Sequence, residues 1–314
     1  MKYYIALDGG TSNTRLRLIQ NEDVISAEKL AMGAGTAGGK EKWSAEIVKS
    51  IGALLAKNAL SEKDVVAVIA SGMVTSEYGL MSMPHLSAPA GLSELAAGMK
   101  KTSLSGTDIP FFFIPGVKML FDSAEKTDMM RGEEAEVMGL LTYGGKDCVY
   151  VLPGTHSKHV FVDGEGRISA FSTFMTGEMI AALSSATILR DAVDLSVEGF
   201  DADALLRGYD AAVAQGISAA LFKTRIMKNL FSADARACYS FFLGALLSDE
   251  IRSLANSGAS RALVAGKAAL RLPTEYLLRE RSRVHLVSCP EHAIENASVL
   301  GAVGIFEKRM TWDA

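Results

Sequence analysis

The sequence has 314 residues, of which 49% are hydrophobic and 22% are charged, and this composition excludes a disordered chain. Its 32 basic and 36 acidic side chains give a net charge of −4, which excludes the broad basic surface that duplex nucleic acid requires. Domains usually contain about 100–200 residues, so we expect two domains.

Cysteine usage and hydropathy point to the cytoplasm. The three cysteines, Cys148, Cys238 and Cys289, are far apart and fit neither a disulfide framework nor a zinc site. The sequence shows no apolar run of signal-peptide type at its start and no stretch near the ~18 apolar residues of a membrane helix. We therefore predict a cytoplasmic protein that binds neither membranes nor nucleic acid.

The first part of the chain predicts short strands followed by a helix. Apolar, β-prone runs occur at residues 3–7, 14–19, 24–30 and 65–70. Residues 41–60 predict an amphipathic helix, because Trp43, Ile47 and Ile51 recur at helical spacing. Strands that first meander and then alternate with helices predict a mixed sheet covered by helices, which is an α/β fold.

The second half of the chain repeats this opening. Strands are predicted at residues 148–152, 159–162 and 168–173, with the turn Gly154-Thr155-His156-Ser157-Lys158 between the first two. This turn aligns with Gly10-Thr11-Ser12-Asn13-Thr14, which also lies between two apolar strands. The remaining predicted elements are helices at 179–191, 202–214, 216–228, 235–255 and 293–309 and strands at 261–265 and 284–287.

The two glycine-rich turns predict a nucleotide site. Backbone N–H groups and short hydroxyl side chains in such turns form a concave site for phosphate. Two of them facing each other would hold a triphosphate from both sides. The residues concerned are Gly10, Thr11, Ser12, Asn13, Gly154, Thr155, His156 and Ser157. Asp8, beside the first turn, is placed to hold Mg²⁺, which prefers hard oxygen ligands.

Other glycine, histidine and serine motifs give weaker signals. No P-loop pattern occurs, and no histidine pair has metal-ligand spacing. A Gly-x-Gly-x-x-Gly pattern does occur at Gly33, Gly35 and Gly38. The next predicted strand ends at Ala70-Ser71-Gly72, without the acidic residue that a Rossmann site uses to hold ribose. We therefore interpret this segment as a loop and place an NAD-binding oxidoreductase last among the hypotheses.

A dense polar cluster covers residues 128–136 and leads into a predicted helix. Acidic residues in a first helical turn stabilise the helix dipole, which is one explanation of Glu133 and Glu134. The other is that one carboxylate acts as a general base while Arg131 binds an anion. The pattern alone leaves both open.

Small residues line one stripe of the predicted C-terminal helix, at Ala293, Ala297 and Gly301. Gly139 lies in the helix that follows the polar cluster. Small side chains allow two helices to cross closely, either at a hinge between domains or in an ordinary core.

Several blocks together resemble the sugar-kinase branch of the actin/hexokinase/Hsp70-like ATPase superfamily, and within it the 2-dehydro-3-deoxygalactonokinase family. The most specific blocks are Arg131-Gly132-Glu133-Glu134, Pro153-Gly154-Thr155-His156-Ser157-Lys158 and Met175-Thr176-Gly177-Glu178. Further matching blocks are Ala6-Leu7-Asp8-Gly9-Gly10-Thr11, Ser71-Gly72-Met73-Val74-Thr75-Ser76 and Leu263-Val264-Ala265-Gly266. The resemblance runs nearly end to end.

The resemblance implies two ribonuclease-H-like lobes with mixed β-sheets flanked by helices and a cleft between the lobes. Lobe I would comprise residues 1–129 and the C-terminal helix 293–314, and lobe II residues 130–292. The implied reaction transfers a phosphoryl group from ATP, with Mg²⁺, to the C6 hydroxyl of 2-dehydro-3-deoxy-D-galactonate in galactonate breakdown.

Site residues follow from the same resemblance. Glu133 would be the general base with Glu134 the second choice, Asp8 would bind magnesium, and Ala265-Gly266 would form the adenosine turn. The implied substrate-binding residues are Arg15, Met73, Ser76, Pro89, Ala90 and Arg131. Because the substrate is an anion, either Arg15 or Arg131 should bind its carboxylate.

Two alternatives remain at this point: a kinase of a different sugar or sugar acid on the same fold, and an actin-like protein that binds nucleotide for assembly rather than for phosphoryl transfer. The expected partner is the small sugar-acid substrate, with a homodimer possible by the default for such enzymes.

Overall fold

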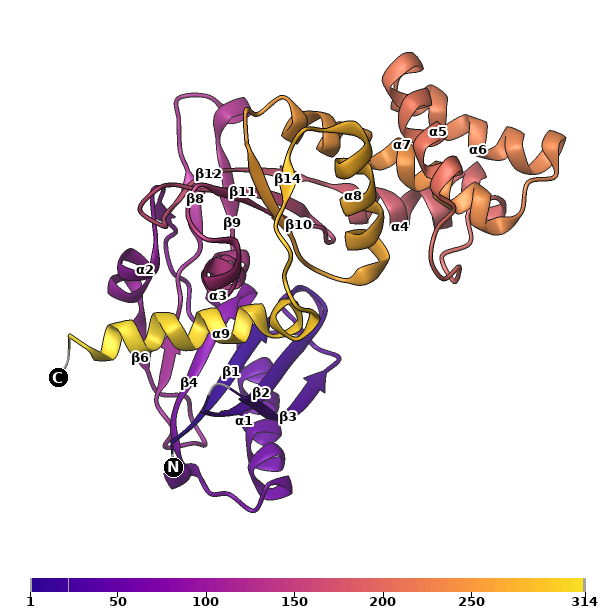
Figure 1. Ribbon diagram of the computed structural model, residues 1–314. Coiled ribbons are helices and arrows are strands. Elements are labelled where there is room, and N and C mark those ends of the chain that lie inside the picture. The colour runs from indigo at the N-terminus through magenta and orange to yellow at the C-terminus, as the bar shows by residue number, and fades with distance from the viewer. Residues whose placement is uncertain (1, 22, 313–314) are drawn as a thin grey trace. The chain divides into compact units, whose positions relative to one another are not determined.

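The computed structural model describes residues 2–21 and 23–312. The chain forms two compact units (Figure 1). The first comprises Met1–Lys146, Val162–Ala170 and Pro290–Ala314, and the second comprises Asp147–Phe161 and Phe171–Cys289. These bounds differ from the expected ones, because residues 130–146 and the tip at 162–170 belong to the first unit.

The first unit is built on a six-stranded sheet of order β3-β2-β1-β4-β7-β6. Its strands are β1 (Tyr3–Gly9), β2 (Thr14–Gln20), β3 (Asp23–Leu30), β4 (Val65–Gly72), β6 (Lys100–Thr102) and β7 (Phe111–Phe113). β1, β2 and β3 form an antiparallel meander, whereas β4 pairs parallel to both β1 and β7. The central strands alternate apolar residues into a core that includes Ile5, Leu7 and Val68.

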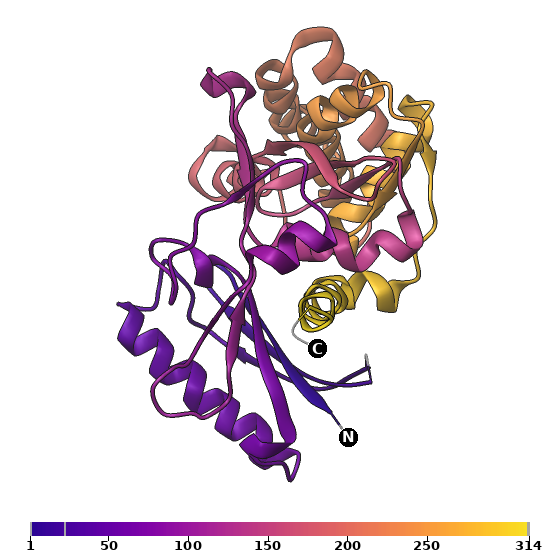
Figure 2. The same ribbon diagram turned by 90° about the vertical axis from the view of Figure 1, so that its left-hand side faces the viewer.

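Two long helices cover opposite faces of this sheet, α1 (Lys40–Lys57) and α9 (Glu291–Met310) (Figure 2). α1 buries the apolar stripe expected from its sequence, and the Trp43 indole N–H donates to the buried Thr14 hydroxyl at 2.9 Å. The helix ends three residues before the expected position, and Ala59 follows with a positive φ of 55°. The earlier end does not change which side chains of the helix are buried.

Helix α3 (Glu133–Gly144) packs against α9 inside the first unit. The two helices cross at glycines: a Cβ added at Gly139 would overlap the Ala297 carbonyl, and one added at Gly301 would overlap the Ala135 carbonyl. The small-residue stripe therefore serves close core packing within one unit. This packing explains why the unit extends to Lys146 instead of ending at residue 129.

The segment between α1 and α3 contains more regular structure than its sequence suggests. It includes α2 (Leu92–Gly98) and a three-stranded sheet of order β5-β8-β9. The strands of that sheet are β5 (Leu86–Ser87), β8 (Val117–Met119) and β9 (Asp128–Met130). Here short elements are stabilised by contacts distant in sequence, so local pattern signals are weak.

The second unit contains a five-stranded sheet of order β12-β11-β10-β13-β14. Its strands are β10 (Cys148–Leu152), β11 (Ser157–Val162), β12 (Ile168–Phe174), β13 (Arg261–Val264) and β14 (His285–Leu286). The order repeats β3-β2-β1-β4-β7 of the first unit, with β10 in the place of β1 and β13 parallel to it in the place of β4. The predicted repeat of the strand-turn-strand unit is thus part of two matching sheets.

Helices pack around the second sheet and extend beyond it. They are α4 (Thr176–Ala186), α5 (Ala202–Gln215), α6 (Ile217–Phe231), α7 (Ala235–Ala255) and α8 (Ala268–Arg281). α7 is buried along most of its length and contributes Phe242, Leu243 and Leu247 to the core. The long sequence-predicted helix at 179–191 is divided in the structure, with α4 ending at Ala186 and a short 3₁₀ turn at Ile188–Asp191.

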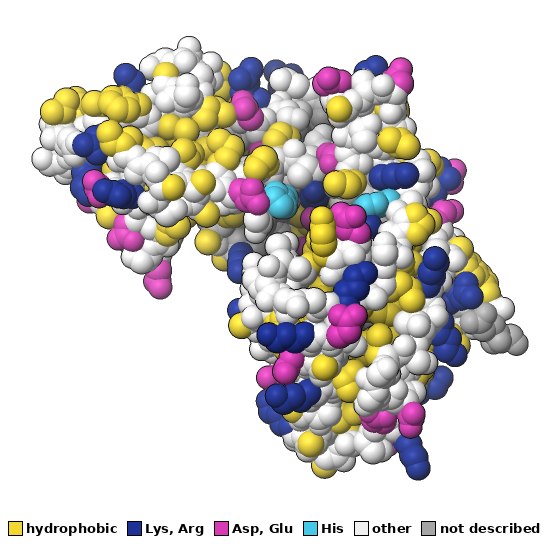
Figure 3. All heavy atoms as spheres, turned by 180° about the vertical axis from the view of Figure 1, so that it is seen from behind, with side chains coloured by type: hydrophobic (Ala, Val, Ile, Leu, Met, Phe, Trp, Pro, Cys, Tyr) yellow, Lys and Arg dark blue, Asp and Glu magenta, His cyan; other side chains and the backbone are white. Residues whose placement is uncertain are grey.

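Apolar side chains also lie on the surface of the second unit, where Figure 3 shows them gathered over its helical part. Phe222, Leu230 and Phe231 of α6 are all exposed, the last at 76%. These exposed side chains do not establish a homodimer, which stays a prediction.

In the part of the chain that the structure describes, no helix combines the length and apolar character needed to span a bilayer.

Candidate active site

The first glycine-rich turn joins β1 to β2. The Gly10 N–H donates to the Asn13 carbonyl at 2.8 Å, which closes the turn, and the Thr11 and Ser12 side chains are exposed at its tip. The exposed hydroxyl groups of the turn therefore lie at one end of the sheet.

The Gly33–Gly38 segment supports this turn from the side. The Ala34 and Gly35 N–H groups donate to the Gly10 and Thr11 carbonyls at 3.1 and 2.8 Å. The segment leads from β3 into α1, but the strand that follows α1, β4, pairs with β1 and is separated from β3 by two strands, so the segment does not open a Rossmann unit of neighbouring parallel strands. Its glycines allow close approach to the turn: a Cβ added at Gly33 would lie 2.7 Å from the Thr11 carbonyl oxygen.

Asp8 lies near the end of β1, next to the start of α3. Its Oδ2 is 3.4 Å from Nη1 of Arg15 on β2, and the two side chains are 33% and 44% exposed. Gly72, at the end of β4, has a φ of +82° and would bring an added Cβ to 3.3 Å from Asp8 Oδ1. A Cβ added at Gly132 would in turn lie 3.3 Å from the Gly72 Cα. The two glycines thus let the strand ends and the α3 N-terminus approach closely.

Glu133 and Glu134 begin α3 in different environments. Glu133 is partly exposed, and its Oε2 accepts a hydrogen bond from the Arg131 N–H at 3.0 Å. Glu134 is fully buried, and both its oxygens lie 2.8 Å from the Gly132 N–H that donates to them. Burial, and then the nearby Glu133 charge, raise the pKa of Glu134 to about 8. Glu134 is therefore a protonated, buried side chain at neutral pH.

Glu136 is a third acidic residue in the first turn of α3, and the sequence analysis did not assign it to the site. It lies one helical turn after Glu133, and burial, then Glu133 and Asp8, raise its pKa to about 7 against the opposing charges of Arg17 and Arg15. Arg17 donates to the Ser298 hydroxyl at 3.2 Å, which connects β2 to α9. The sequence feature that could have identified Glu136 is its position three residues after Glu133, which places both side chains on one face of the helix.

Arg131 organises the segment that follows β4. Its Nη1 donates to the Thr75 carbonyl and hydroxyl at 2.8 and 2.6 Å, and its Nη2 donates to the Met83 carbonyl at 3.2 Å. Nη2 also lies 3.3 Å from His85 Nδ1. Burial, then the charges of Arg131 and Lys118, lower the pKa of His85 to about 4, so the neutral ring accepts this contact. Both terminal nitrogens of Arg131 are thus engaged with protein groups, whereas Arg15 is more exposed.

The expected substrate loops also lie in the first unit. In the first loop, the Ser76 hydroxyl donates to the Met73 carbonyl at 2.8 Å and closes a turn. In the second, Pro89 is exposed and follows a cis peptide bond, while Ala90 is buried.

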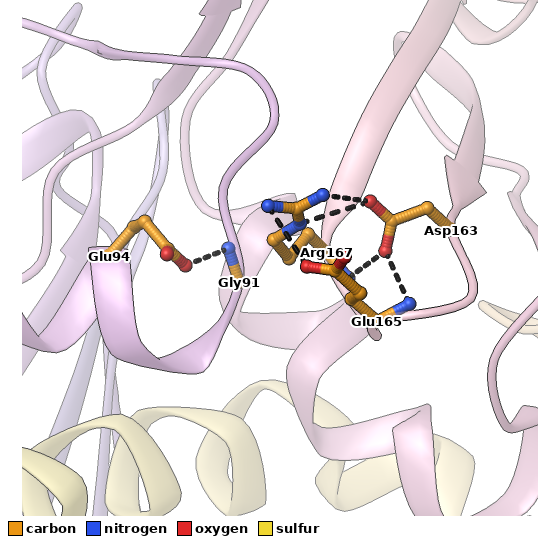
Figure 4. A network of polar contacts seen from close by, with 5 residues as sticks. All are labelled: Gly91, Glu94, Asp163, Glu165 and Arg167. Carbon is orange, nitrogen blue, oxygen red and sulfur yellow. Dashed lines mark hydrogen bonds and ion pairs between the residues drawn. The ribbon is translucent and has the colours of Figure 1, made fainter.

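The backbone of Ala90 pairs with Ile168, at 2.8 and 3.0 Å, so the loop is held by the hairpin tip between β11 and β12. In Figure 4, Arg167 of this tip points toward Asp163 and Glu165, while Glu94 accepts from the Gly91 N–H. The Arg167 Nη2 lies 3.0 Å from Asp163 Oδ2, and the Asp163 carboxylate also accepts from the Glu165 and Arg167 N–H groups. The tip is therefore internally fixed where it pairs with the loop.

The second glycine-rich turn, in the other unit, joins β10 to β11 and packs against the N-terminus of α4. The Gly154 N–H donates to the Ser157 hydroxyl at 3.3 Å, and Thr155 and His156 are exposed at the tip. The Glu178 N–H of α4 donates to the Thr155 carbonyl at 3.2 Å, and His156 Nε2 lies 3.0 Å from the Glu178 carboxylate. The turn is therefore held in place by α4.

Ala265 and Gly266 lie beside this second turn. The Ala265 N–H donates to the Val151 carbonyl at 2.9 Å, and a Cβ added at Gly266 would lie 2.8 Å from the Pro153 carbonyl oxygen. The two segments that the resemblance assigns to phosphate and to adenosine are therefore adjacent within the second unit.

These arrangements suit phosphate and a hydrated divalent cation. Among the residues described, no group of three or more His, Cys, Asp or Glu side chains could enclose a metal ion. Magnesium commonly binds through one or two carboxylates together with substrate phosphates. Asp8, a partly exposed carboxylate beside a phosphate-type turn, fits that mode of binding.

Comparison with known proteins agrees with this geometry. The model of the 2-keto-3-deoxy-galactonokinase family matches residues 8–299. A Rhizobium meliloti (strain 1021) protein named as a probable 2-dehydro-3-deoxygalactonokinase is 31% identical over 265 residues, 82% of each chain. The Escherichia coli (strain K12) 2-dehydro-3-deoxygalactonokinase is 29% identical over 275 residues, 87% of each chain.

Solved structures share the fold. A Sinorhizobium meliloti protein whose name carries 2-dehydro-3-deoxygalactonokinase superposes with a TM-score of 0.77 at 26% identity, covering 99% of this chain and 100% of its own. Component A of the Acidaminococcus fermentans (R)-2-hydroxyglutaryl-CoA dehydratase has a TM-score of 0.56 at 14% identity, with 99% and 100% covered. The expected α/β fold of actin-like ATPase type is confirmed.

Proposed function

The chain belongs to the 2-keto-3-deoxy-galactonokinase family, which makes it a sugar-acid kinase, and from this premise we propose that it phosphorylates 2-dehydro-3-deoxy-D-galactonate at the C6 hydroxyl. A bond forms between the C6 oxygen and the γ-phosphorus of ATP, and the bond from that phosphorus to the bridging oxygen breaks. The products are the 6-phosphate and ADP. We place this step in galactonate breakdown in the cytoplasm.

The two glycine-rich turns bind the phosphate groups of ATP in this proposal, and Ala265-Gly266 binds the adenosine. The support is their shared position after the first strand of matching sheets, with exposed hydroxyl side chains at both tips and the exposed His156 imidazole at the second. Asp8 holds Mg²⁺, which supplies positive charge that neutralises the phosphate oxygens. Because phosphoryl transfer depends mainly on positioning and charge, these groups carry most of the catalysis.

Glu133 is the proposed general base that accepts the proton of the C6 hydroxyl. It is partly exposed at the start of α3, on the same unit as Asp8, whereas Glu134 is buried with a pKa of about 8 and holds the Gly132 N–H. A base must reach the hydroxyl that it deprotonates, and only the exposed carboxylate of the two can do so. Glu134 then has a structural role at the helix start.

Arg15 is the proposed partner of the substrate carboxylate. Its side chain is 44% exposed and makes one long contact to Asp8. Arg131 instead uses both terminal nitrogens on the segment from Thr75 to His85, and so it orders the first substrate loop. Met73, Ser76, Pro89 and Ala90 shape the two substrate loops around the acceptor.

One observation carries the proposal: the family match extends from Asp8 through both turns and Ala265-Gly266 to residue 299. The test measures ADP release with MgATP and a panel of acceptors: 2-dehydro-3-deoxygalactonate, 2-dehydro-3-deoxygluconate, glucose, glycerol and buffer alone. Glu133→Gln should lower kcat by roughly 10²–10⁴-fold, the usual contribution of a general base. Glu46→Gln, on the exposed side of α1, is the matched control.

Turnover of the galactonate derivative, lost in Glu133→Gln and kept in Glu46→Gln, supports both substrate and base. Phosphorus NMR of the product then tests the C6 position. Turnover of the neutral acceptors alone would overturn the substrate assignment. Nucleotide binding without any acceptor-dependent ADP release would favour the assembly protein instead.

A further inference from the structure

Three buried polar side chains meet in the second unit, on three different elements. His159 lies on β11, Glu250 in the C-terminal half of α7, and Thr176 at the start of α4. The His159 Nε2 is 3.4 Å from Glu250 Oε2, and the Thr176 hydroxyl donates to Glu250 Oε1. Their exposures are 2%, 1% and 4%. We call these three residues the Glu250 cluster.

The Glu250 cluster is not what core packing alone would produce. Burying a carboxylate and an imidazole costs free energy, and apolar side chains of similar volume often give a more stable core. In addition, neither His159 Nδ1 nor Glu250 Oε2 has a hydrogen-bond partner among the described residues. Buried polar atoms without a partner are rare in folded proteins and often mark a functional requirement.

The cluster holds both sides of the second glycine-rich turn. His159 comes two residues after Ser157, the last residue of the turn, and leads away from it along β11. Thr176 precedes the two residues of α4 that contact the turn directly. A Cβ added at Gly177 would lie 2.6 Å from the Thr155 Cα, and the Glu178 N–H donates to the Thr155 carbonyl at 3.2 Å.

Glu250 connects these two sides to the most buried helix of the unit. Its oxygens contact Thr176 and His159, and α7 around it contributes Leu246, Leu247 and Ile251 to the core. Glu250 therefore connects the start of α4 and the start of β11 to one buried helix. The turn lies between these two segments, one joined to Glu250 by a hydrogen bond and the other by the 3.4 Å contact.

We propose that Thr176, Glu250 and His159 are positioning residues that hold the Gly154–Ser157 turn in the geometry that binds the phosphate groups of the nucleotide. The inference rests on the proposed function, which assigns phosphate to this turn. Its physical basis is that backbone donors stabilise a phosphoryl group only when they are already oriented toward it. All three are buried, so they act on the nucleotide through the turn.

Thr176→Val tests the inference, because it removes the hydroxyl while keeping the shape of the side chain. We expect the KM for MgATP to rise about tenfold, since small misplacements of binding groups have effects of this order. The KM for the acceptor should stay within about twofold, and Thr176→Ser, which restores the hydroxyl, should bring the KM for MgATP back. Thr224→Val is the matched control: Thr224 is also buried in this unit, on α6, and its hydroxyl has no partner among the described residues.

Glu250→Gln is the second variant in case Thr176→Val does not fold, and it should raise the KM for MgATP in the same way. The inference is wrong if a folded Thr176→Val or Glu250→Gln keeps the native KM, or if Thr224→Val raises it equally. Calorimetric titration of the native protein with MgADP separates the two proposals. If the native protein does not bind MgADP, the proposed function itself is refuted. If it binds MgADP and the variants keep the native KM for MgATP, the positioning role alone is refuted.

Discussion

Glu134 links the start of α3 to the pH dependence of stability. Its pKa is about 8 in the folded protein, against 4.5 for an unperturbed glutamic acid. Between these values the folded chain keeps a proton that the unfolded chain has lost. The group therefore favours folding fully below about pH 4.5, and this contribution is lost as the pH rises toward 8. Glu136, with a pKa of about 7, acts in the same direction.

Glu134→Gln should make the free energy of unfolding less dependent on pH. The amide cannot ionise, and its oxygen can still accept from the Gly132 N–H. Between pH 5.5 and 8 we expect the native protein to lose about 1–3 kcal/mol more than the variant. Urea titrations at several pH values measure this difference, with Glu46→Gln as a control that keeps the native slope. Parallel pH profiles for native and Glu134→Gln proteins would contradict the raised pKa.

Single residues differ in how far the sequence predicts their role. Asp8 could be proposed from the local pattern, because it ends a visible strand beside a glycine-rich turn, whereas Glu133 was proposed from the family resemblance, since the pattern alone left its role open. The two candidate arginines could not be separated, since the Arg131 contact to Thr75 joins residues 56 positions apart. The Glu250 cluster was also invisible: its contact to Thr176 spans 74 positions, and its sequence signal is one glutamate within a helical pattern.

At the scale of elements, the crossing of α3 and α9 should be the least tolerant of added volume. Gly139→Ala and Gly301→Ala each place a methyl group against a backbone carbonyl of the other helix, so we expect each to cost about 1–3 kcal/mol or more. Gly52→Ala in α1 is the control, because an added Cβ there has nothing within 4 Å and should stabilise by about 0.5–1 kcal/mol. Denaturant unfolding compares the three. Equal effects at all three positions would show that helix propensity, and not the crossing, decides.

Elements with strong periodicity were predicted well, and those held by distant contacts were not. The five buried residues of α1 are the apolar residues that define its helical stripe. The seven-residue α2 was missed, although Glu94 accepts from the Gly91 N–H at its start in the pattern of a capping interaction. The bounds of the units depend on α3 packing on α9, about 150 residues later in the chain, which no local pattern shows.

On the scale of the whole molecule, two sheets of the same strand order are joined by a chain that enters each unit more than once. The repeat of the two glycine-rich turns made this duplication predictable. The first unit is discontinuous in sequence: it contains residues 290–314 as its last segment and needs that segment to be complete. Residues 147–161 and 171–289 of the second unit all precede that segment.

A chain ending at Cys289 should therefore retain the second unit and lose the first. Without α9, the Phe306 ring no longer packs on Tyr4 and Phe112, whose ring centroids lie 5.7 and 4.8 Å away, and α3 loses its partner helix. Hydrogen exchange followed by mass spectrometry should show β1 and β4 exchanging rapidly while α7 stays protected. A chain ending at Met310, which keeps all of α9, is the control and should show native protection throughout. Native protection of β1 and β4 in the shorter chain would mean that the first unit folds without its C-terminal helix.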